Sequence, residues 1–364
     1  MAICRSTFRS VTESRLITNA LRGGWRTLIL LIVVSAYSST TTAAEDLVPR
    51  TTLDNPAIAY RKADQHSVVL KRADVEVIVV DNEAVRDDRL PDHRAGYSGI
   101  ASLKHSRSSK NYFVPTYSGL NYEHILDGRA EPDRKIQFEP RNWPMELRII
   151  GDHAVELYQS PTFHHGLESC QRYELLADGT IQLTIEVIPR RRSFPAGYIC
   201  LFWASYINQP ESLDIHFRGI AADKVSENRA PSQWIRGITP QHGVRATHPS
   251  VDDQRNFAHD EPYPLTLVFQ LSDHRYTEPW YFGVNDGLAF VQMFRPQDQV
   301  RLTQSPSGGG AGNPAWDFQY LIDHYEVDRR YQFVMRAACL PFESADQIAE
   351  ATERNRLELA SDVP

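Results

Sequence analysis

The sequence predicts an all-β protein, a large antiparallel β-sandwich with one C-terminal helix. Three observations support this prediction. Residues 181–187 alternate between apolar and polar side chains, the period of a strand with one buried and one solvated face. Asp178-Gly179 separates this run from residues 173–176, and Asp-Gly favours a tight hairpin turn because glycine adopts a positive φ without steric cost. Residues 197–208 are too apolar to face water on either side. We therefore expect three consecutive antiparallel strands in one sheet.

The first 44 residues have the layout of a secretory signal peptide. A long region with five arginines precedes the apolar run 28–36, and Thr42 and Ala44 stand as in a small-x-small cleavage site. This run is shorter than the ~20 residues that span a membrane, and no later stretch approaches that length. We expect an exported protein, periplasmic or extracellular, without a stable membrane span after signal removal. An uncleaved N-terminal anchor is the alternative.

Charge and cysteine content limit the possible partners. Removing residues 1–44 removes five arginines and one glutamate, so the net charge changes from −7 to −11. An acidic exported domain favours neither nucleic acid nor anionic membranes. Cys170, Cys200 and Cys339 remain, and an odd number within apolar runs argues against a disulfide framework. One bridge and buried free thiols both stay open. We expect no cofactor, and the oligomeric state is left open.

The remaining elements follow in order along one expected domain. A lead-in segment covers residues 45–67, the β domain covers 68–343, and a helix with a tail covers 344–364. Ser344 and Gln347 have the spacing of a capping box before good helix formers. The polar connection 221–261 is long enough to be functional or mobile. Further strands are expected over residues 68–70, 75–80, 112–117, 120–125, 145–150, 155–158, 213–217, 265–271, 281–284, 288–293 and 331–337.

No strong catalytic motif is present, and three polar-aromatic clusters carry the candidate chemistry. The first contains Glu123 and His124, followed by Glu139, Arg141 and Trp143. A histidine beside a carboxylate can act as acid or base, so His124 is a candidate catalytic residue. Glu123 and Arg141 are candidate binding residues, because a guanidinium can hold a substrate carboxylate through two hydrogen bonds. A surface histidine in a turn is the alternative.

The second cluster contains His164 and Glu168 as candidate catalytic residues and Arg172 as a candidate binding residue. His164 and His165 are adjacent, and adjacent residues of a strand point to opposite faces, so we expect no shared metal. Cation binding by the histidines and acidic residues of the 221–261 connection is less favoured than a solvated loop.

The third cluster, Asn313, Trp316 and Asp317, directly follows the glycine-rich residues 305–312. A tryptophan beside an aspartate suits a sugar, because the aromatic face contacts C–H groups while the carboxylate accepts from hydroxyls. All three residues are therefore candidate substrate-binding residues. A tryptophan that packs within the sandwich is the alternative.

The order of elements around residues 166–208 resembles the galactose mutarotase-like β-supersandwich. Members carry a strand of the form Asn-His-x-Tyr-Phe-Asn, whose histidine protonates the sugar ring oxygen. Tyr206 and Asn208 match this strand, but Ala204 stands in the position of the histidine. His124 is the nearest counterpart of a second family histidine, and the family's C-terminal glutamate has no counterpart. The chain also resembles uncharacterised exported proteins of marine, polysaccharide-degrading bacteria.

The resemblance implies a sugar-handling fold, since supersandwiches serve as epimerases, lyase and hydrolase modules, and accessory domains. A methyl group cannot transfer a proton, so Ala204 argues against ring-opening epimerisation. We predict an exported carbohydrate-active protein with a cleft lined by the three clusters. If it is an enzyme, it is a glycoside hydrolase, polysaccharide lyase or epimerase-like enzyme. A non-catalytic glycan-binding module and a structural envelope protein are the alternatives.

Overall fold

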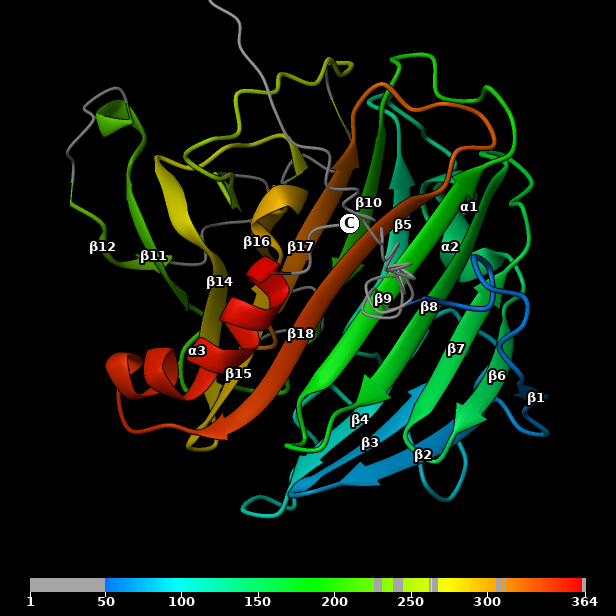
Figure 1. Cartoon of the computed structure of the whole chain (residues 1–364), viewed down its shortest axis with the longest axis horizontal. Coiled ribbons are helices and arrows are strands. Elements are labelled where there is room, and N and C mark those ends of the chain that lie inside the picture. The colour runs from blue at the N-terminus through cyan, green and yellow to red at the C-terminus, as the bar shows by residue number, and fades with distance from the viewer. Residues whose placement is uncertain are drawn as a thin grey trace, which may run out of the picture. The chain divides into compact units, whose positions relative to one another are not determined.

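The computed structural model describes residues 50–225, 231–237, 245–261, 263, 268–305, 310 and 312–361, so the expected signal peptide lies outside it. The strands form three antiparallel sheets (Figure 1). The ten-stranded sheet has the order β1 (Arg61–Lys62), β6 (Glu146–Gly151), β7 (Ala154–Gln159), β8 (Leu167–Leu175), β9 (Ile181–Pro189), β18 (Tyr331–Pro341), β15 (Leu288–Phe294), β14 (His274–Asn285), β11 (Ile215–Ala221) and β12 (Gln233–Gly237). The five-stranded sheet has the order β13 (Thr247–His248), β16 (Arg301–Ser305), β17 (Ala315–Ile322), β10 (Ile199–Ala204) and β5 (Asn121–Leu126). The third sheet contains β2 (Ser67–Arg72), β3 (Val75–Val80) and β4 (Gly99–His105).

The core lies between the inner faces of the two larger sheets. The apolar residues of β9, among them Leu183 and Ile185, belong to one buried cluster with Trp203 of β10 and Phe318 of β17. The Trp203 and Phe318 rings stack at 5.3 Å between centroids. Large apolar side chains from both sheets are thus removed from water together, which is the main stabilising contribution in such a sandwich. This confirms the predicted all-β sandwich.

The two strands predicted on either side of Asp178-Gly179 form as expected, but the third predicted strand, over residues 197–208, lies in another sheet. β8 and β9 pair antiparallel across a turn in which Gly179 has φ 85°. The prediction that β10 joins the same sheet is wrong, because β10 pairs with β17 and β5 of the facing sheet. The second edge of β9 is occupied by β18 instead.

The prediction that one face of β9 is exposed to solvent is also wrong. The side chains of Thr184 and Glu186 are 1% and 0% exposed. Thr51 covers Glu186 and donates a hydrogen bond to its carboxylate from the backbone N–H at 3.2 Å, and Arg330 contacts the same carboxylate at 2.8 Å. A segment far away in the sequence therefore buries the polar face.

Six further predicted strands are confirmed and pair as three antiparallel hairpins, β2–β3, β6–β7 and β14–β15. In the last, Asp286 and Gly287 both have a positive φ, as the tightest hairpin turns require. The strand expected over 112–117 is wrong, because Phe113 forms only an isolated bridge with Ile207. Of the strand expected over 265–271, residues 265–267 lie outside the described residues, and Leu271 forms only an isolated bridge. The strands β1, β4, β12, β13, β16 and β17 were not predicted.

The C-terminal helix is confirmed as α3 (Ala345–Ser361), with the Gln347 N–H donating to Ser344 Oγ at 3.1 Å. Its buried Ile348 and Leu359 pack on Trp280 and other apolar residues of the ten-stranded sheet. Two one-turn helices that the sequence did not indicate, α1 (Arg134–Gln137) and α2 (Glu139–Asn142), lie beside β5. Within the described residues, no helix is long and apolar enough to cross a membrane. The three cysteines after the expected signal peptide are buried free thiols.

Candidate functional site

Glu123 is the centre of a buried polar cluster on β5. The pairing of β5 with β10 shifts register at this point, so Glu123 falls between the paired residues Tyr122 and His124. Its two carboxylate oxygens accept hydrogen bonds from the Tyr206 hydroxyl at 2.9 and 2.7 Å. The Asn121 side-chain amide donates to it at 3.1 Å. Burial, followed by the Glu123 charge, raises the pKa of Tyr206 well above its ordinary value, so the hydroxyl keeps its proton and remains a donor.

His124 lies beside this carboxylate as a neutral imidazole. Its Nδ1 lies 2.8 Å from the Gln137 carbonyl oxygen, which only accepts, so Nδ1 carries the proton. Its Nε2 lies 3.7 Å from Glu123 Oε1. Burial lowers the pKa of His124, although the Glu123 charge opposes this. The side chain is 2% exposed. His124 is therefore a histidine of the interior, held by α1.

Arg141 connects α2 to the cluster. Its guanidinium lies 3.9 Å from the centroid of the Tyr97 ring and 4.9 Å from that of Phe138. Its Nε donates to the Gly96 carbonyl at 2.7 Å, and its Nη1 lies 3.5 Å from Glu123. The Arg141 side chain is 18% exposed, whereas that of Glu123 is 6% exposed. Arg141 therefore attaches α2 to β5 and presents little surface to a ligand.

Trp316 and Asp317 of the third predicted cluster point to opposite faces of β17, and Asn313 lies before this strand. Asp317 Oδ1 accepts a hydrogen bond from the Ser205 N–H at 3.1 Å. Burial, followed by the Glu123 charge, raises the pKa of Asp317 well above its ordinary value, which places Asp317 in the electrostatic field of the first cluster. Trp316 is fully buried, and its indole N–H donates to the Leu213 carbonyl at 3.2 Å. No face of Trp316 is open to a sugar. Asn313 accepts from the Gln209 N–H at 2.9 Å.

The adjacent histidines of the second cluster lie in different environments. His164 is exposed, and His165 is 3% exposed. His165 Nδ1 lies 2.6 Å from Glu139 Oε2, and the His165 N–H donates to the same oxygen at 3.1 Å. Burial raises the pKa of Glu139, but the hydrogen bond and charge of His165 and the His164 N–H outweigh burial, so the net shift is downward. Sequence reasoning singled out His164 and missed the pair His165–Glu139.

Glu168 and Arg172 lie on β8 but have different partners. Glu168 accepts from the Tyr158 hydroxyl at 2.6 Å and from Arg190 at 2.7 Å. Burial, followed by Glu168, raises the pKa of Tyr158 to about 12. Arg172 donates at 3.0 Å to Glu156, which is fully buried. Glu123 therefore contacts both His124 and Arg141, and its charge acts on Asp317. The other candidates have separate partners, namely His164, Glu168, Arg172, Asn313 and Trp316.

An aromatic pair, formed by the half-buried Trp143 and the exposed Phe163, lies where α2 meets the turn before β8. The ring centroids are 6.3 Å apart, and the ring planes are inclined by 30°. Phe163 is 66% exposed and contacts the His164 ring at 4.9 Å. The Trp143 indole N–H donates to Ser160 Oγ at 3.1 Å. Trp143 stood in the first sequence cluster, but its pairing with Phe163 depends on tertiary contacts.

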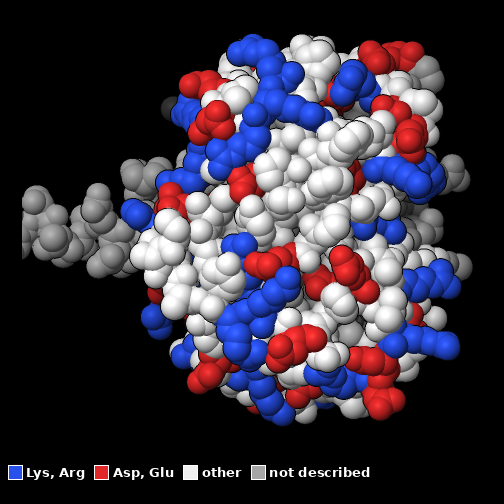
Figure 2. Space-filling view, turned by 90° about the vertical axis from the view of Figure 1, so that its right-hand side faces the viewer, with Lys and Arg blue, Asp and Glu red and all other residues white. Residues whose placement is uncertain are grey.

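A cleft of about 320 Å³ adjoins this pair, and we call it the edge cleft. It lies between the β1–β6–β7 edge of the ten-stranded sheet and the ends of β2 and β3. Figure 2 views this side of the molecule and shows acidic and basic side chains interspersed with uncharged surface. The lining residues are Lys62, Ala63, Asp64, Gln65, His66, Asp81, Glu83, Pro144, Met145, Glu146, Leu147, Tyr158 and Ser160.

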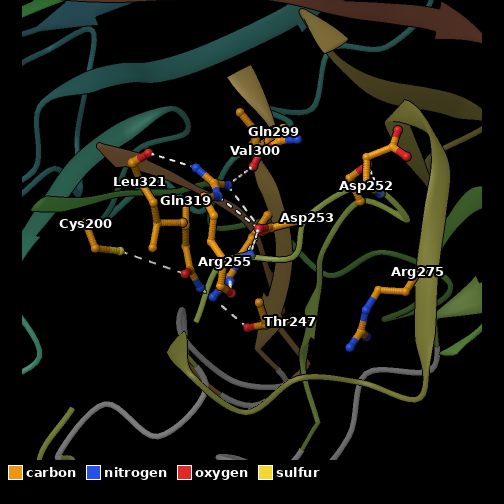
Figure 3. Close-up of polar contacts among 12 residues, drawn as sticks. Cys200, Thr247, Asp252, Asp253, Arg255, Arg275, Gln299, Val300, Gln319 and Leu321 are labelled. Atoms are coloured by element: carbon orange, nitrogen blue, oxygen red, sulfur yellow. Dashed lines mark hydrogen bonds and ion pairs between the residues drawn. The ribbon is translucent and has the colours of Figure 1, made fainter. Parts of the chain in front are cut away.

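The connection after β13 is attached to the five-stranded sheet by a buried charge network. The Asp253 side chain is fully buried and lies 2.9 Å from Arg255 and 3.0 Å from Arg301. Arg255 also donates to the carbonyls of Leu321 and Gln299 at 3.1 and 2.8 Å, as Figure 3 shows. The expectation of a solvated loop is therefore wrong for this part. His242 lies outside the described residues.

Two further findings concern metal binding and the similarity of the chain to known proteins. Within the part of the chain that the structure describes, no three His, Cys, Asp or Glu residues gather as a metal ion would require. No family model matches the chain, and no curated protein matches it.

Solved structures give low similarity. A putative aldose 1-epimerase from Escherichia coli K12 matches with TM-score 0.41 and 11% identity over 76% of this chain and 99% of that one. The α-N-acetylgalactosaminidase NagBb from Bifidobacterium bifidum, in complex with GalNAc, matches with TM-score 0.42 and 11% identity over 80% and 39%. Heparan sulfate lyase HepC from Pedobacter heparinus matches with TM-score 0.36 and 10% identity over 80% and 38%. At these values the similarities assign neither a family nor an activity.

Proposed function

We propose that this chain is an exported protein of the galactose mutarotase-like superfamily that binds a carbohydrate on the aromatic pair and in the edge cleft. The single observation that carries the proposal is the pair of the half-buried Trp143 and the exposed Phe163 beside a cleft lined with polar groups. Aromatic faces suit the C–H faces of sugars, and hydroxyl, amide and carboxylate groups fix the sugar hydroxyls. An exposed Phe163 has no role in the core, and a ligand surface explains its position.

The buried residues of the first cluster have a supporting role in this proposal. Glu123 and Arg141 attach α2, which directly precedes Trp143. His124 holds α1 through the Gln137 carbonyl. Ligand affinity depends on the rigid placement of such contact residues, since ordering them during binding costs free energy.

The other candidate residues divide between the ligand side and the support. His164 contacts Phe163, and Glu168 fixes the Tyr158 ring that lines the edge cleft, so both lie on the ligand side. The remaining candidates support the fold: Arg172, Asn313, Trp316 and Asp317.

A second candidate function is hydrolysis or cleavage of a glycan, and one observation favours it. Burial raises the pKa of the Asp317 carboxyl well above its ordinary value, while Tyr206 and Arg141 contact Glu123. Two carboxyl groups in unlike environments can act as acid and base. In this candidate Asp317 is the acid and Glu123 the base.

Calorimetry with a panel of neutral, amino and anionic polysaccharides tests the proposal on the purified full chain. We expect W143A and F163A each to weaken binding at least about 10-fold, because a stacked aromatic ring contributes about 1.4 kcal/mol or more. L357A, a change of an exposed residue of α3, is the matched control and leaves affinity unchanged. Absence of binding to every polysaccharide in the panel contradicts the proposal.

Measuring reducing ends and the absorbance of unsaturated products in the same samples tests the second candidate. If the chain turns over a glycan through the carboxyl pair, E123Q and D317N each abolish turnover. Binding without turnover in the wild-type chain rules out the second candidate.

A further inference from the structure

One histidine of the edge cleft is oriented by a buried carboxylate. His66 Nδ1 lies 2.9 Å from Asp81 Oδ2, and Asp81 Oδ1 accepts from the Glu83 N–H at 2.9 Å. The Asp81 side chain is 4% exposed, whereas that of His66 is 56% exposed. With Nδ1 engaged by Asp81, Nε2 is the ring nitrogen left for a ligand in the cleft that His66 lines. The pair Asp81–His66 thus holds a hydrogen-bonding group in a fixed direction.

The charges that line the edge cleft are mainly negative. Four carboxylates, those of Asp64, Asp81, Glu83 and Glu146, face one lysine, Lys62. Lys62 lies 3.2 Å from Glu146, and Glu146 also contacts Arg148 at 2.8 Å.

Of the four carboxylates that line the edge cleft, three form ion pairs with protein side chains and one does not, within the described part of the chain. Asp81 pairs with His66, and Asp64 lies 3.6 Å from Arg61. None of the ion pairs among the described residues involves Glu83. Glu83 is therefore the lining carboxylate whose charge a ligand can neutralise.

Aromatic groups border the same cleft. Tyr158 lines it, and the Trp143 indole N–H donates to Ser160, another lining residue. Aromatic faces attract cations as well as sugar C–H groups. A carboxylate or sulfate placed beside the lining carboxylates is repelled, whereas an ammonium group is attracted by them. The groups of the cleft therefore suit a sugar with a positive charge.

We propose that the edge cleft selects glycans with free amino groups over glycans with carboxylate or sulfate groups, and that Glu83 and His66 are its specificity-determining residues. Glu83 binds the ammonium group through a charge-assisted hydrogen bond, and His66 Nε2 binds a sugar hydroxyl. This inference rests on the proposed function, because it names the class of sugar for the same surface.

Calorimetry on the full chain with three tetrasaccharides of equal length tests the inference: a glucosamine, an N-acetylglucosamine and a galacturonate oligomer. We expect the glucosamine oligomer to bind most tightly and the galacturonate oligomer at least about 10-fold more weakly. E83Q reduces the preference for glucosamine over N-acetylglucosamine about 5-fold or more, because the carboxylate that binds the ammonium group loses its charge. H66Q weakens both. Thermal unfolding of each variant checks that the fold is intact.

D87N is the matched control, since Asp87 follows Glu83 in the same loop and does not line the cleft. It removes the same charge, and an asparagine oxygen still accepts the hydrogen bonds that Asp87 Oδ1 receives from the Arg89 and Leu90 N–H groups. A preference that E83Q and D87N reduce equally overturns the assignment of Glu83. Equal or tighter binding of galacturonate overturns the inference while the proposed function stands, whereas absence of binding to all three and to the wider polysaccharide panel overturns both.

Discussion

Buried carboxyl groups determine much of the chemistry of this protein at the residue scale. The Asp253 side chain is buried between two arginines. Glu139 is buried where it accepts hydrogen bonds from the backbone N–H groups of His164 and His165. Asp317 is buried with a backbone N–H and in the field of Glu123, which favours its protonated form. A buried carboxylate is tolerated where partners compensate its lost hydration, and a carboxyl group without them keeps its proton.

Asp317→Asn is expected to increase stability at neutral pH relative to the wild type. The folded-state pKa of Asp317 is raised above its ordinary 3.8, so the group contributes stability below the unfolded-state value, and this contribution is lost as pH rises toward the folded-state value. Asparagine cannot ionise and still accepts the Ser205 N–H. Guanidinium unfolding between about pH 4 and about pH 8 measures the effect.

As pH rises, we expect the unfolding free energy of D317N to increase relative to that of the wild type. Glu343→Gln, a change of an exposed carboxylate on the same chain, serves as control and shows no such trend. A D317N variant that loses stability relative to the wild type as pH rises contradicts this account.

At the scale of elements, α2 organises the surface around the proposed site. Glu139 binds His165, Arg141 contacts Glu123, and Trp143 follows directly after the helix. The helix is one turn long and contains Pro140, so no helical periodicity indicates it in the sequence. Its position depends on these tertiary contacts, which explains why the sequence identified the residues but not their arrangement.

β14 and β17 approach closely where Gly283 lies under the Trp316 ring. A Cβ atom at Gly283 would lie 2.2 Å from Trp316 Cη2, well inside van der Waals contact. Gly283→Ala is therefore expected to destabilise the fold by about 1–3 kcal/mol, the usual cost of overpacking a core. Chemical denaturation measures this cost.

Gly151→Ala is the control, because nothing lies within 4 Å of a Cβ at Gly151. We expect it to change stability by no more than about 0.5 kcal/mol. Equal stability of the two variants contradicts the packing of Trp316 against β14.

At the scale of the whole molecule, α3 forms a further layer on the ten-stranded sheet, as the red helix in Figure 1 shows. Its residues Ile348 and Leu359 cover apolar side chains of β14, β15 and β18, among them Trp280 and Val291. Without this layer, those side chains would face water, and burial of such apolar area contributes about 25 cal/mol per Å². We therefore expect α3 to unfold together with the sandwich.

Ile348→Ala is expected to lower the unfolding free energy by about 2–5 kcal/mol, as for other truncations of buried aliphatic residues. Leu357→Ala, at an exposed position of the same helix, changes it by no more than about 0.5 kcal/mol. Circular dichroism and tryptophan fluorescence report the same transition if α3 folds with the sheet. Two separate transitions contradict this layering.

The sequence by itself determined the fold class, the local hairpins and the C-terminal helix, because these depend on alternation, turn chemistry and capping between near neighbours. Asp178-Gly179 and Ser344 with Gln347 are examples in which a few adjacent residues fix the local structure. Tertiary structure alone decided that β10 leaves the sheet of β8 and β9, since strand pairing depends on which edge is free. It also decided that Glu186 is buried beneath Thr51, that Trp316 is inaccessible, and that Trp143 meets Phe163 beside the edge cleft. Burial and proximity are set by segments far apart in the sequence, so residue type and spacing identify candidate chemistry but not the surface on which it acts.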